Sequence, residues 1–242
     1  DGFQIDSDSQ ASSWRLSLAD GWDGVLARMK SSMRRKLRKA DRRAESAACQ
    51  TIFAETPAEI AQWWQTFVTL HQRRFTSKGE PGCFADQRFA SFLKAATLLL
   101  ADRGAVWLVV AMYEGAPLAA QLYWRAGPEL QMYQSGAAPD RMEHEPGYTL
   151  FAAVIRRAID EGYAALDLLR GDEDYKSRLG AIPIPLHRVR MAPPRFGAAS
   201  RFFLYNAART VKRKWLAKAP SVELPCSDDA SSDEASAPQG GA

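Results

Sequence analysis

The sequence predicts an α/β (α+β) fold, in which a mixed, mostly antiparallel sheet is flanked by helices. Three observations lead to this fold class. Three β-rich runs within 105–137 are separated by short turn signals, which indicates an antiparallel meander. Two amphipathic helical patterns precede the meander. A third helical pattern, at 148–161, leads into a further apolar strand at 163–169, so the sheet is expected to be mixed.

Length and composition bound the class of protein. The 242 residues are 46% hydrophobic and 25% charged, which suits one large domain or one typical domain with appendages. No apolar run reaches the roughly 18–20 residues that span a bilayer, and the polar N-terminus shows no secretory signal. The scattered Cys49, Cys83 and Cys226 lack metal spacing and indicate free thiols. We therefore expect a cytoplasmic protein without a metal site.

The net charge of +4 conceals a segregation of charge. Basic residues crowd Arg28–Arg43 and Arg201–Lys218, whereas the tail after Pro220 carries acids and no Lys or Arg. Basic clusters attract polyanions and anionic membranes, and solvated helix faces are the alternative interpretation.

The N-terminal segment of the chain is expected to end in a connector helix. Residues 1–12 are expected to be disordered and 14–18 to form a short strand. Asp20 then resembles a helix cap, and one helix is expected to continue to residue 47 with an apolar stripe and otherwise basic faces. Because this helix is long and highly charged, we interpret it as leading out of a preceding domain.

The remaining elements follow in order. A strand is expected at 49–55, and Thr56, Pro57 and Glu59 then form a capping box with Pro at the first helical position. A second helix is expected from about residue 86. After the meander come a polar loop at 139–146, the helix at 148–161, the strand at 163–169, a short polar turn or helix, a strand at 185–192 and a basic helix at 202–218.

These patterns predict four segments. They are an N-terminal segment with the connector helix (1–45), an α/β domain (46–195), a C-terminal basic helix (196–219) and a disordered acidic tail (220–242).

The stretch 131–180 holds the candidate site. Gly147 stands at the start of a helix, where the N–H groups of Tyr148, Thr149 and Leu150 are expected to face an anion. The alternative is that Pro146-Gly147 simply starts a helix. Gln134 and Tyr133 are expected to line a ligand channel, although a Tyr in a strand is more often a core residue, and Gln121 is a further polar residue within an apolar strand.

Further candidates follow the strand at 163–169. Asp167 lies among apolar residues, and a buried carboxylate suits a general base or a partner of Arg170. Arg170 begins a turn at the carboxyl end of the strand, where α/β sheets place ligands. Lys176 follows Tyr175 and suits a phosphate or an oxyanion, or else a solvated ion pair with Asp172 or Asp174. Glu143, His144 and Glu145 are alternative bases.

Several strings resemble a known family. LDLLRGDEDYKSRLG (166–180) is similar to a signature of the acetyltransferase-like CelD proteins of bacterial cellulose biosynthesis, which have a GNAT-type fold and are distantly similar to the FemABX peptidyltransferases. MRRKLRKADRR, TLHQRRF, YEGAPLAAQL and EPGYTLFAAVIRRAIDEGY match as well, so the resemblance covers roughly 26–190.

The resemblance implies direct acyl transfer from acyl-CoA or another activated donor to an amine or hydroxyl, in envelope or exopolysaccharide metabolism. It places the CoA pyrophosphate at Gly147, Tyr148 and Thr149 and a lysine such as Lys176 at the donor phosphate or the oxyanion, so residues 46–195 are expected to form a GNAT-like acyltransferase domain. Together with the residue patterns above, this predicts Gln134 and Arg170 at the donor and catalysis by Lys176, Asp167 and Tyr175. The loop departs from the family pattern because Gly147 is its one glycine near the helix start and acidic residues precede it.

The acceptor is expected to be a small molecule, a saccharide or a peptide. Two alternatives stay open. One is a FemABX-like peptidyltransferase that uses aminoacyl-tRNA, whose phosphates would bind the basic segments. The other is a non-catalytic module that docks on an anionic membrane or a synthase.

Overall fold

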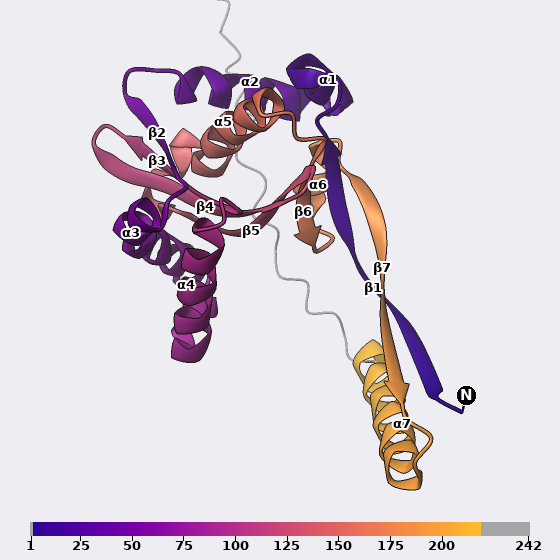
Figure 1. Cartoon of the computed structure of the whole chain (residues 1–242). Helices are drawn as coiled ribbons and strands as arrows, with labels where there is room; N and C mark the ends of the chain where they lie inside the picture. Colours follow the sequence, from indigo (N-terminus) through magenta and orange to yellow (C-terminus); the bar gives the residue numbers. More distant parts are fainter. Residues whose placement is uncertain (1, 219–242) are drawn as a thin grey trace, which may run out of the picture. The chain divides into compact units, whose positions relative to one another are not determined.

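The computed structural model describes residues 2–218, with side chains to residue 209 (Figure 1). The predicted acidic tail at 220–242, including Cys226, lies outside these residues. The described chain divides into a larger unit, Asp8–Arg188, and a smaller unit that combines its first residues with those from Val189 onward.

A seven-stranded sheet in the order β2-β3-β4-β5-β6-β1-β7 organises the fold. The antiparallel meander is formed by β3 (Val106–Tyr113), β4 (Ala116–Ala126) and β5 (Glu129–Ala137), and β2 (Cys49–Ala54) extends it. On the other side, β6 (Ala165–Arg170) is parallel to β5 and antiparallel to β1 (Gln4–Ser17), which neighbours β7 (Ile182–Ala192). The predicted mixed, mostly antiparallel sheet flanked by helices is confirmed.

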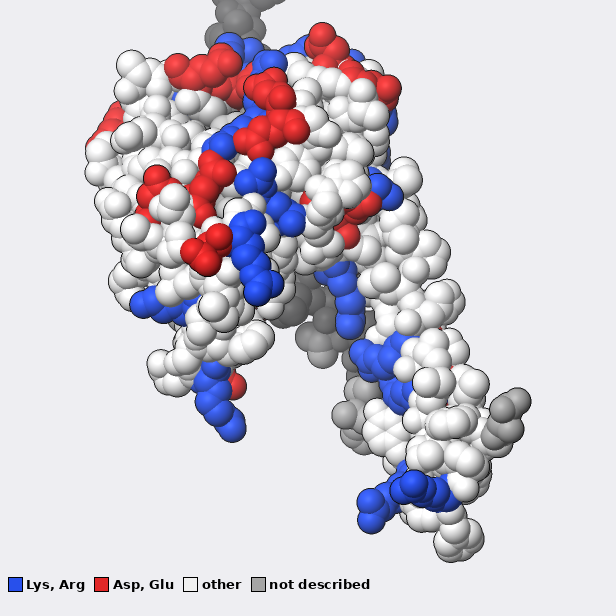
Figure 2. Space-filling model, viewed as in Figure 1, with Lys and Arg blue, Asp and Glu red and all other residues white. Residues whose placement is uncertain are grey.

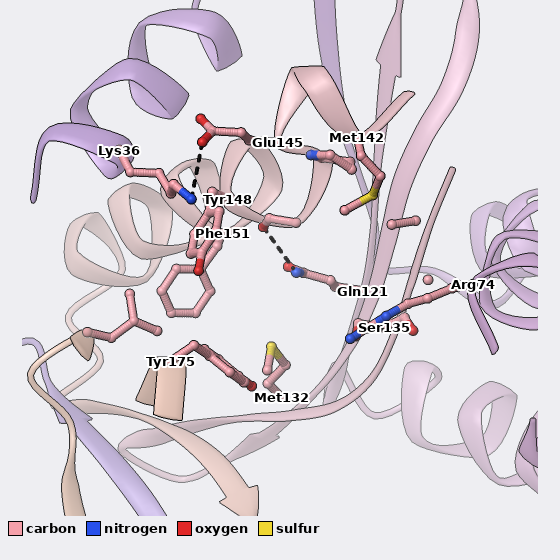
Figure 3. A pocket seen from close by; sticks show the side chains of 15 residues that line it. Lys36, Arg74, Gln121, Met132, Ser135, Met142, Glu145, Tyr148, Phe151 and Tyr175 are labelled. Carbon is pink, nitrogen blue, oxygen red and sulfur yellow. Dashed lines mark hydrogen bonds and ion pairs between the residues drawn. The ribbon is translucent and has the colours of Figure 1, made fainter. Parts of the chain in front are cut away.

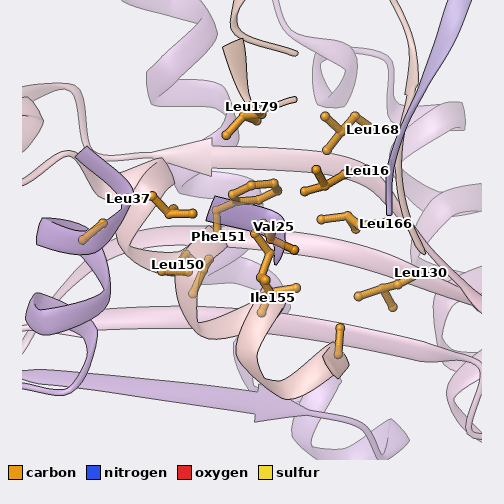
Figure 4. Packing of buried hydrophobic residues seen from close by; sticks show 14 of the residues in the cluster. Leu16, Val25, Leu37, Leu130, Leu150, Phe151, Ile155, Leu166, Leu168 and Leu179 are labelled. Carbon is orange, nitrogen blue, oxygen red and sulfur yellow. The ribbon is translucent and has the colours of Figure 1, made fainter. Parts of the chain in front are cut away.

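Helices cover both faces of this sheet because strand residues alternate between two apolar sides. Trp107, Val109 and Ala111 of β3 belong to a cluster with α1 (Gly21–Arg28), α2 (Ser31–Ala44) and α5 (Pro146–Asp160). Val106, Leu108 and Val110 instead pack with α3 (Pro57–Thr76) and α4 (Gln87–Ala101). Figure 4 shows Leu150, Phe151 and Ile155 of α5 packed between the sheet and the first helices.

The start of α3 confirms the predicted capping box. The backbone N–H of Thr56 donates to Glu59 Oε2 at 3.0 Å, and the N–H of Glu59 donates to Thr56 Oγ1 at 3.3 Å. Pro57 occupies the first helical position, where its missing N–H costs no hydrogen bond.

The N-terminal region differs from the prediction in two ways. β1 begins at Gln4, so residues predicted to be disordered form a strand. The predicted single helix is two helices, because Met29 and Lys30 have extended ψ values of 149° and 147°. The apolar stripe of α2, which includes Met33 and Leu37, is buried in the core. The connector interpretation overlooked this packing because a basic outer face does not show what lies beneath the inner one.

Buried polar contacts also fix α2. Asp41 is 8% exposed and accepts two hydrogen bonds from Arg156 of α5, at 3.1 and 2.6 Å. The guanidinium of Arg156 lies 4.1 Å from the ring centroid of Trp22 on α1. The three helices are therefore joined by one cluster.

On the face shown in Figure 2, basic and acidic side chains lie next to one another.

Shorter elements complete the larger unit. They are the 3₁₀ turns η1 (Cys83–Ala85) and η2 (Pro139–His144) and the one-turn helix α6 (Asp174–Arg178). In the smaller unit, the Asp6 carboxylate pairs with Arg190 at 3.0 Å and with Arg209 of α7 (Phe196–Lys218) at 3.3 Å. The predicted segment boundaries at 45, 195 and 219 stay predictions.

Candidate acyl-transfer site

The continuity of the sheet breaks between β5 and β6. Their register pairs only Glu129–Gln131 with Ala165–Asp167 among the described residues. Residues 132–137 of β5 are then paired with β4 alone, and the register shift beside Tyr133 indicates a bulge. The second edge of this half of β5 is therefore open.

A cavity of about 390 Å³ lies beside this open edge (Figure 3). Its walls come from both faces of the sheet, because Arg74 belongs to α3 whereas Lys36 and Phe151 belong to α2 and α5. The lining is largely apolar and comprises Lys36, Arg74, Gln121, Met132, Ser135, Gly136, Ala137, Met142, Glu145, Pro146, Gly147, Tyr148, Phe151, Tyr175 and Leu179. An apolar cavity with a few polar groups is the usual form of a small-molecule site.

Two polar contacts cross the floor of the cavity. The guanidinium of Arg74 donates to Ser135 Oγ at 2.5 Å. The amide of Gln121 donates to the Gly147 carbonyl oxygen at 3.4 Å, and its own oxygen accepts a 2.6 Å hydrogen bond from the hydroxyl of Tyr123. Gln121 is thus a fixed connection between β4 and the start of α5.

The phenol of Tyr175 reaches the cavity from α6, beside Met132 (Figure 3). Its hydroxyl has no hydrogen-bond partner in the described part of the chain. Burial raises the pKa of Tyr175 to about 12, and the carboxylate of Glu173 acts in the same direction. At neutral pH this phenol is therefore protonated and is a hydrogen-bond donor to whatever occupies the cavity.

The start of α5 differs from the predicted anion site. Gly147 and Tyr148 line the cavity, but Thr149 is fully buried and its hydroxyl donates to the His144 carbonyl oxygen at 3.2 Å. The N–H groups of Tyr148 and Thr149 both donate to the carbonyl oxygen of Glu145, at 3.0 and 3.1 Å. Their predicted orientation toward an anion is therefore wrong, because the first turn already uses both donors.

A carboxylate also stands at this helix start. Glu145 is the N-cap residue in a left-handed conformation, with φ 47° and ψ 54°. Its Oε1 lies 3.4 Å from Lys36 Nζ, and Lys36 is 5.2 Å from the ring centroid of Tyr148. The negative charge and the used N–H groups disfavour a pyrophosphate at this point.

The other predicted site residues lie outside the lining of the cavity. Lys176 is 2% exposed and donates to the carbonyl oxygens of Leu169 and Gly171, both at 3.1 Å. Asp167 accepts hydrogen bonds from Ser13 Oγ at 2.7 Å and from the N–H of Leu169 at 2.8 Å. The structure thus brings Tyr175, Gly147 and Tyr148 together and turns Lys176 and Asp167 toward backbone groups.

Arg170 and Gln134 are also separate from the cavity. Arg170 is exposed. Gln134 pairs with Leu122 on the α3 side of the sheet, where its oxygen is 3.1 Å from Nε2 of the buried His71. Side chains alternate along a strand, so Ser135 and not Gln134 faces the cavity.

Sequence reasoning missed Lys36, Arg74 and Ser135. Arg74 had a weak signal, because it belongs to the TLHQRRF string at the end of α3. Lys36 is one basic residue among many on α2, and only the packing of α2 against α5 distinguishes it.

The half-open mixed sheet and the cavity beside β5 define an acyltransferase fold of the GNAT type. The profile of the family described as acetyltransferase (GNAT) domain matches residues 31–177, which is more than half of the chain. The chain therefore belongs to this family. No curated protein matches the sequence significantly.

Solved structures share this fold. The crystal structure of FemX is similar with a TM-score of 0.62 at 12% identity, over 75% of this chain and 63% of that chain. The C-terminal domain of a putative lysylphosphatidylglycerol synthetase from Agrobacterium fabrum gives 0.54 at 8% identity, over 83% and 65%. A protein of unknown function from Bacteroides thetaiotaomicron is similar with a TM-score of 0.55 at 14% identity, over 79% of this chain and 62% of that chain.

These similarities establish the fold, and the chain spans less than two thirds of each of the three proteins. Within residues 2–218, no helix combines the length and the hydropathy needed to cross a bilayer.

Proposed function

We propose that this protein transfers an acyl group directly from an activated donor, an acyl-CoA thioester, to an amine or hydroxyl acceptor in the cavity beside β5. One observation carries the proposal: the protonated hydroxyl of Tyr175, which has no hydrogen-bond partner among the described residues, faces a largely apolar cavity at the open edge of a strand. A thioester with an amide-bearing arm suits such a place, because open strand edges bind extended chains through backbone hydrogen bonds.

The cavity residues would divide the chemistry as follows. The acceptor attacks the thioester carbonyl, the new C–N or C–O bond forms, and the C–S bond breaks from the tetrahedral intermediate. Tyr175 donates its proton to the departing sulfur. Glu145, the carboxylate among the described lining residues, takes the proton that the acceptor loses, and the cation of Arg74 stabilises the oxyanion.

The cavity and the open edge of β5 would hold the acyl group and the amide-bearing arm of the donor. This fit does not extend to a pyrophosphate at the start of α5, where the Glu145 carboxylate stands and the N–H groups of Tyr148 and Thr149 are bonded. The phosphates of the donor would therefore lie elsewhere on the surface.

The test combines donor binding and transfer. A series of acyl-CoA thioesters should raise the melting temperature of the wild-type protein and support transfer to amine or hydroxyl acceptors. Tyr175→Phe should lower kcat by about 100-fold. Tyr133→Phe is the matched control and should leave kcat unchanged, because Tyr133 of β5 packs on the α3 side of the sheet, away from the cavity. If no thioester shifts the melting temperature, the proposed donor is wrong.

The pathway forms a finer part of the proposal. The string at 166–180 resembles the CelD signature, which supports an acceptor in envelope or exopolysaccharide synthesis, including cellulose, and a saccharide or peptide acceptor. Deleting the gene should then change the acyl content of the exopolysaccharide. A cytoplasmic location belongs to the same proposal. Docking on a membrane or a synthase through basic segments remains an alternative.

A second candidate function is a peptidyl transfer that uses aminoacyl-tRNA. The FemX-like fold and the outer face of α2 favour it, because Arg35, Arg38, Lys39 and Arg42 are exposed and pair with no described carboxylate. Phosphate contacts make binding salt-dependent. Arg35→Glu combined with Arg38→Glu should then weaken tRNA binding at low salt. Unchanged binding would eliminate this candidate.

A further inference from the structure

The ammonium of Lys176 has all three of its donors engaged. Its Nζ lies 3.1 Å from the Leu169 carbonyl oxygen, 3.1 Å from that of Gly171, and 2.9 Å from Glu173 Oε2. An ammonium has three donors and no acceptor, so a bond to a substrate would require one of these contacts to break. With 2% of its side chain exposed, Lys176 is also shielded from the cavity.

The residue that Lys176 holds has an unusual backbone. Leu169 has φ 56°, in the left-handed region that side chains with a Cβ rarely adopt. Its carbonyl oxygen accepts from Lys176, and its N–H donates to Asp167 Oδ1 at 2.8 Å. Both backbone polar groups of Leu169 are thus bonded to side chains. Ser13 Oγ in turn donates to the same Asp167 oxygen, at 2.7 Å.

This cluster ends at the cavity. Leu169 is the second-last residue of β6, just before the turn into α6, and Tyr175 is the second residue of that five-residue helix. A helix of one turn has little stability of its own, so its position depends on the contacts that anchor it. Lys176, the next residue, supplies the buried anchor while Tyr175 reaches the cavity.

We propose that Lys176 and Asp167 are positioning residues, which hold Leu169 in its left-handed conformation and thereby place the hydroxyl of Tyr175 in the cavity. Neither side chain touches the reacting atoms. The proposal rests on the proposed function, since it assigns the purpose of the cluster to the placement of Tyr175. It replaces the direct roles that the sequence predicts for Lys176 and Asp167.

A second-site rescue tests the proposal. Lys176→Met keeps an apolar chain of similar length but removes all three hydrogen bonds, and kcat should fall by about 100-fold with a much smaller change in KM. Adding Leu169→Gly should restore kcat to within a few-fold of wild type, because glycine adopts positive φ without the Cβ penalty. Ile182→Gly, at an exposed site on β7, is the control and should restore nothing.

The rescue separates the two roles of the lysine. If Lys176 acts on the donor itself, glycine at position 169 cannot supply the missing charge, so a double variant as inactive as Lys176→Met would overturn the proposal. Asp167→Ala provides the parallel experiment if Lys176→Met does not fold. Leu169→Gly should restore activity to that variant as well, and failure there counts equally against the proposal.

The titration of Tyr175 does not depend on acyl transfer, so it distinguishes this proposal from the proposed function. Labelled tyrosine spectra should show the pKa of Tyr175 moving from about 12 toward its ordinary value of 10 in Lys176→Met, and back in the double variant. If the wild-type protein transfers no acyl group but this titration behaves as described, the proposed function fails and the positioning role stands. An unmoved Tyr175 titration in Lys176→Met would refute the positioning role itself.

Discussion

Gly136 of β5 lies directly against the backbone of His71 on α3, so that a Cβ at position 136 would come within 2.3 Å of the His71 nitrogen. This close approach lets the last turns of α3 cross the strand, and Arg74, three residues further on, thereby reaches Ser135 in the cavity. The glycine sets the distance between helix and sheet at the site.

Gly136→Ala should therefore be strongly destabilising. The backbone of α3 would have to move away, and we expect a loss of about 2–4 kcal/mol in the free energy of unfolding, measured in urea. Gly147→Ala is the control in the same cavity, because nothing lies within 4 Å of a Cβ there. The control should lose less than about 0.5 kcal/mol. Equal effects of the two substitutions would contradict the role of the close approach.

His71 predicts a pH dependence of stability. Its side chain is fully buried, and burial lowers its pKa below the ordinary 6.5 despite hydrogen bonds with Gln72 and Gln134 that act in the opposite direction. Below that value the unfolded chain binds a proton that the folded chain does not, so stability is lost as the pH falls through 6.5. Urea unfolding of the wild type and His71→Gln at several pH values measures this. As the pH falls through 6.5, the free energy of unfolding should decrease less in His71→Gln than in the wild type.

Tyr175 should ionise only in strong alkali. The difference in absorbance between wild type and Tyr175→Phe isolates the titration of this phenol, and its midpoint should lie near 12 because of burial and the Glu173 carboxylate. A proton donor of this kind does not limit transfer at moderately alkaline pH. A midpoint near the ordinary value of 10 would show that Tyr175 is exposed to solvent and is not held in the cavity.

The contact between Asp41 and Arg156 should stabilise the packing of α2 on α5. Asp41→Asn removes the charge from a nearly buried carboxylate and takes one acceptor from Arg156, whose side chain is 43% exposed. We expect a loss of about 1–3 kcal/mol in the free energy of unfolding. Asp102→Asn, at an exposed position after α4, should change it by less than about 0.5 kcal/mol. If both variants unfold alike, α2 is not anchored by this pair.

The order of the elements could be predicted from local patterns. The capping box at Thr56, the turns of the meander and the apolar stripe of α5 are short-range signals, and each lies where the sequence indicates. The break at Lys30 could not be predicted, because Met29 and Met33 continue the helical spacing across it. What interrupts the helix is long-range, and it includes the hydrogen bond from the Lys30 N–H to the Arg178 carbonyl oxygen.

The site was less predictable than the fold. Tyr175, Gly147 and Tyr148 were predicted as site residues and line one cavity, but Gln134 lies on the other face, where the bulge at Tyr133 and strand alternation direct it. The charge of Lys176 and the resemblance of 166–180 to a family signature made it a candidate for contact with substrate. Lys176 is instead buried and donates to the carbonyl oxygen of Leu169, whose left-handed conformation no local pattern around a leucine indicates.

The break between β5 and β6 has a consequence for the ligand itself. A donor lying along residues 132–137 would act as a temporary extra strand, and the sheet would become continuous only while it is bound. The backbone amides of this segment should then exchange with deuterium faster in the free protein and slower in the complex. The substrate would thus complete the sheet of its own enzyme, and the sheet would become discontinuous again each time the product leaves.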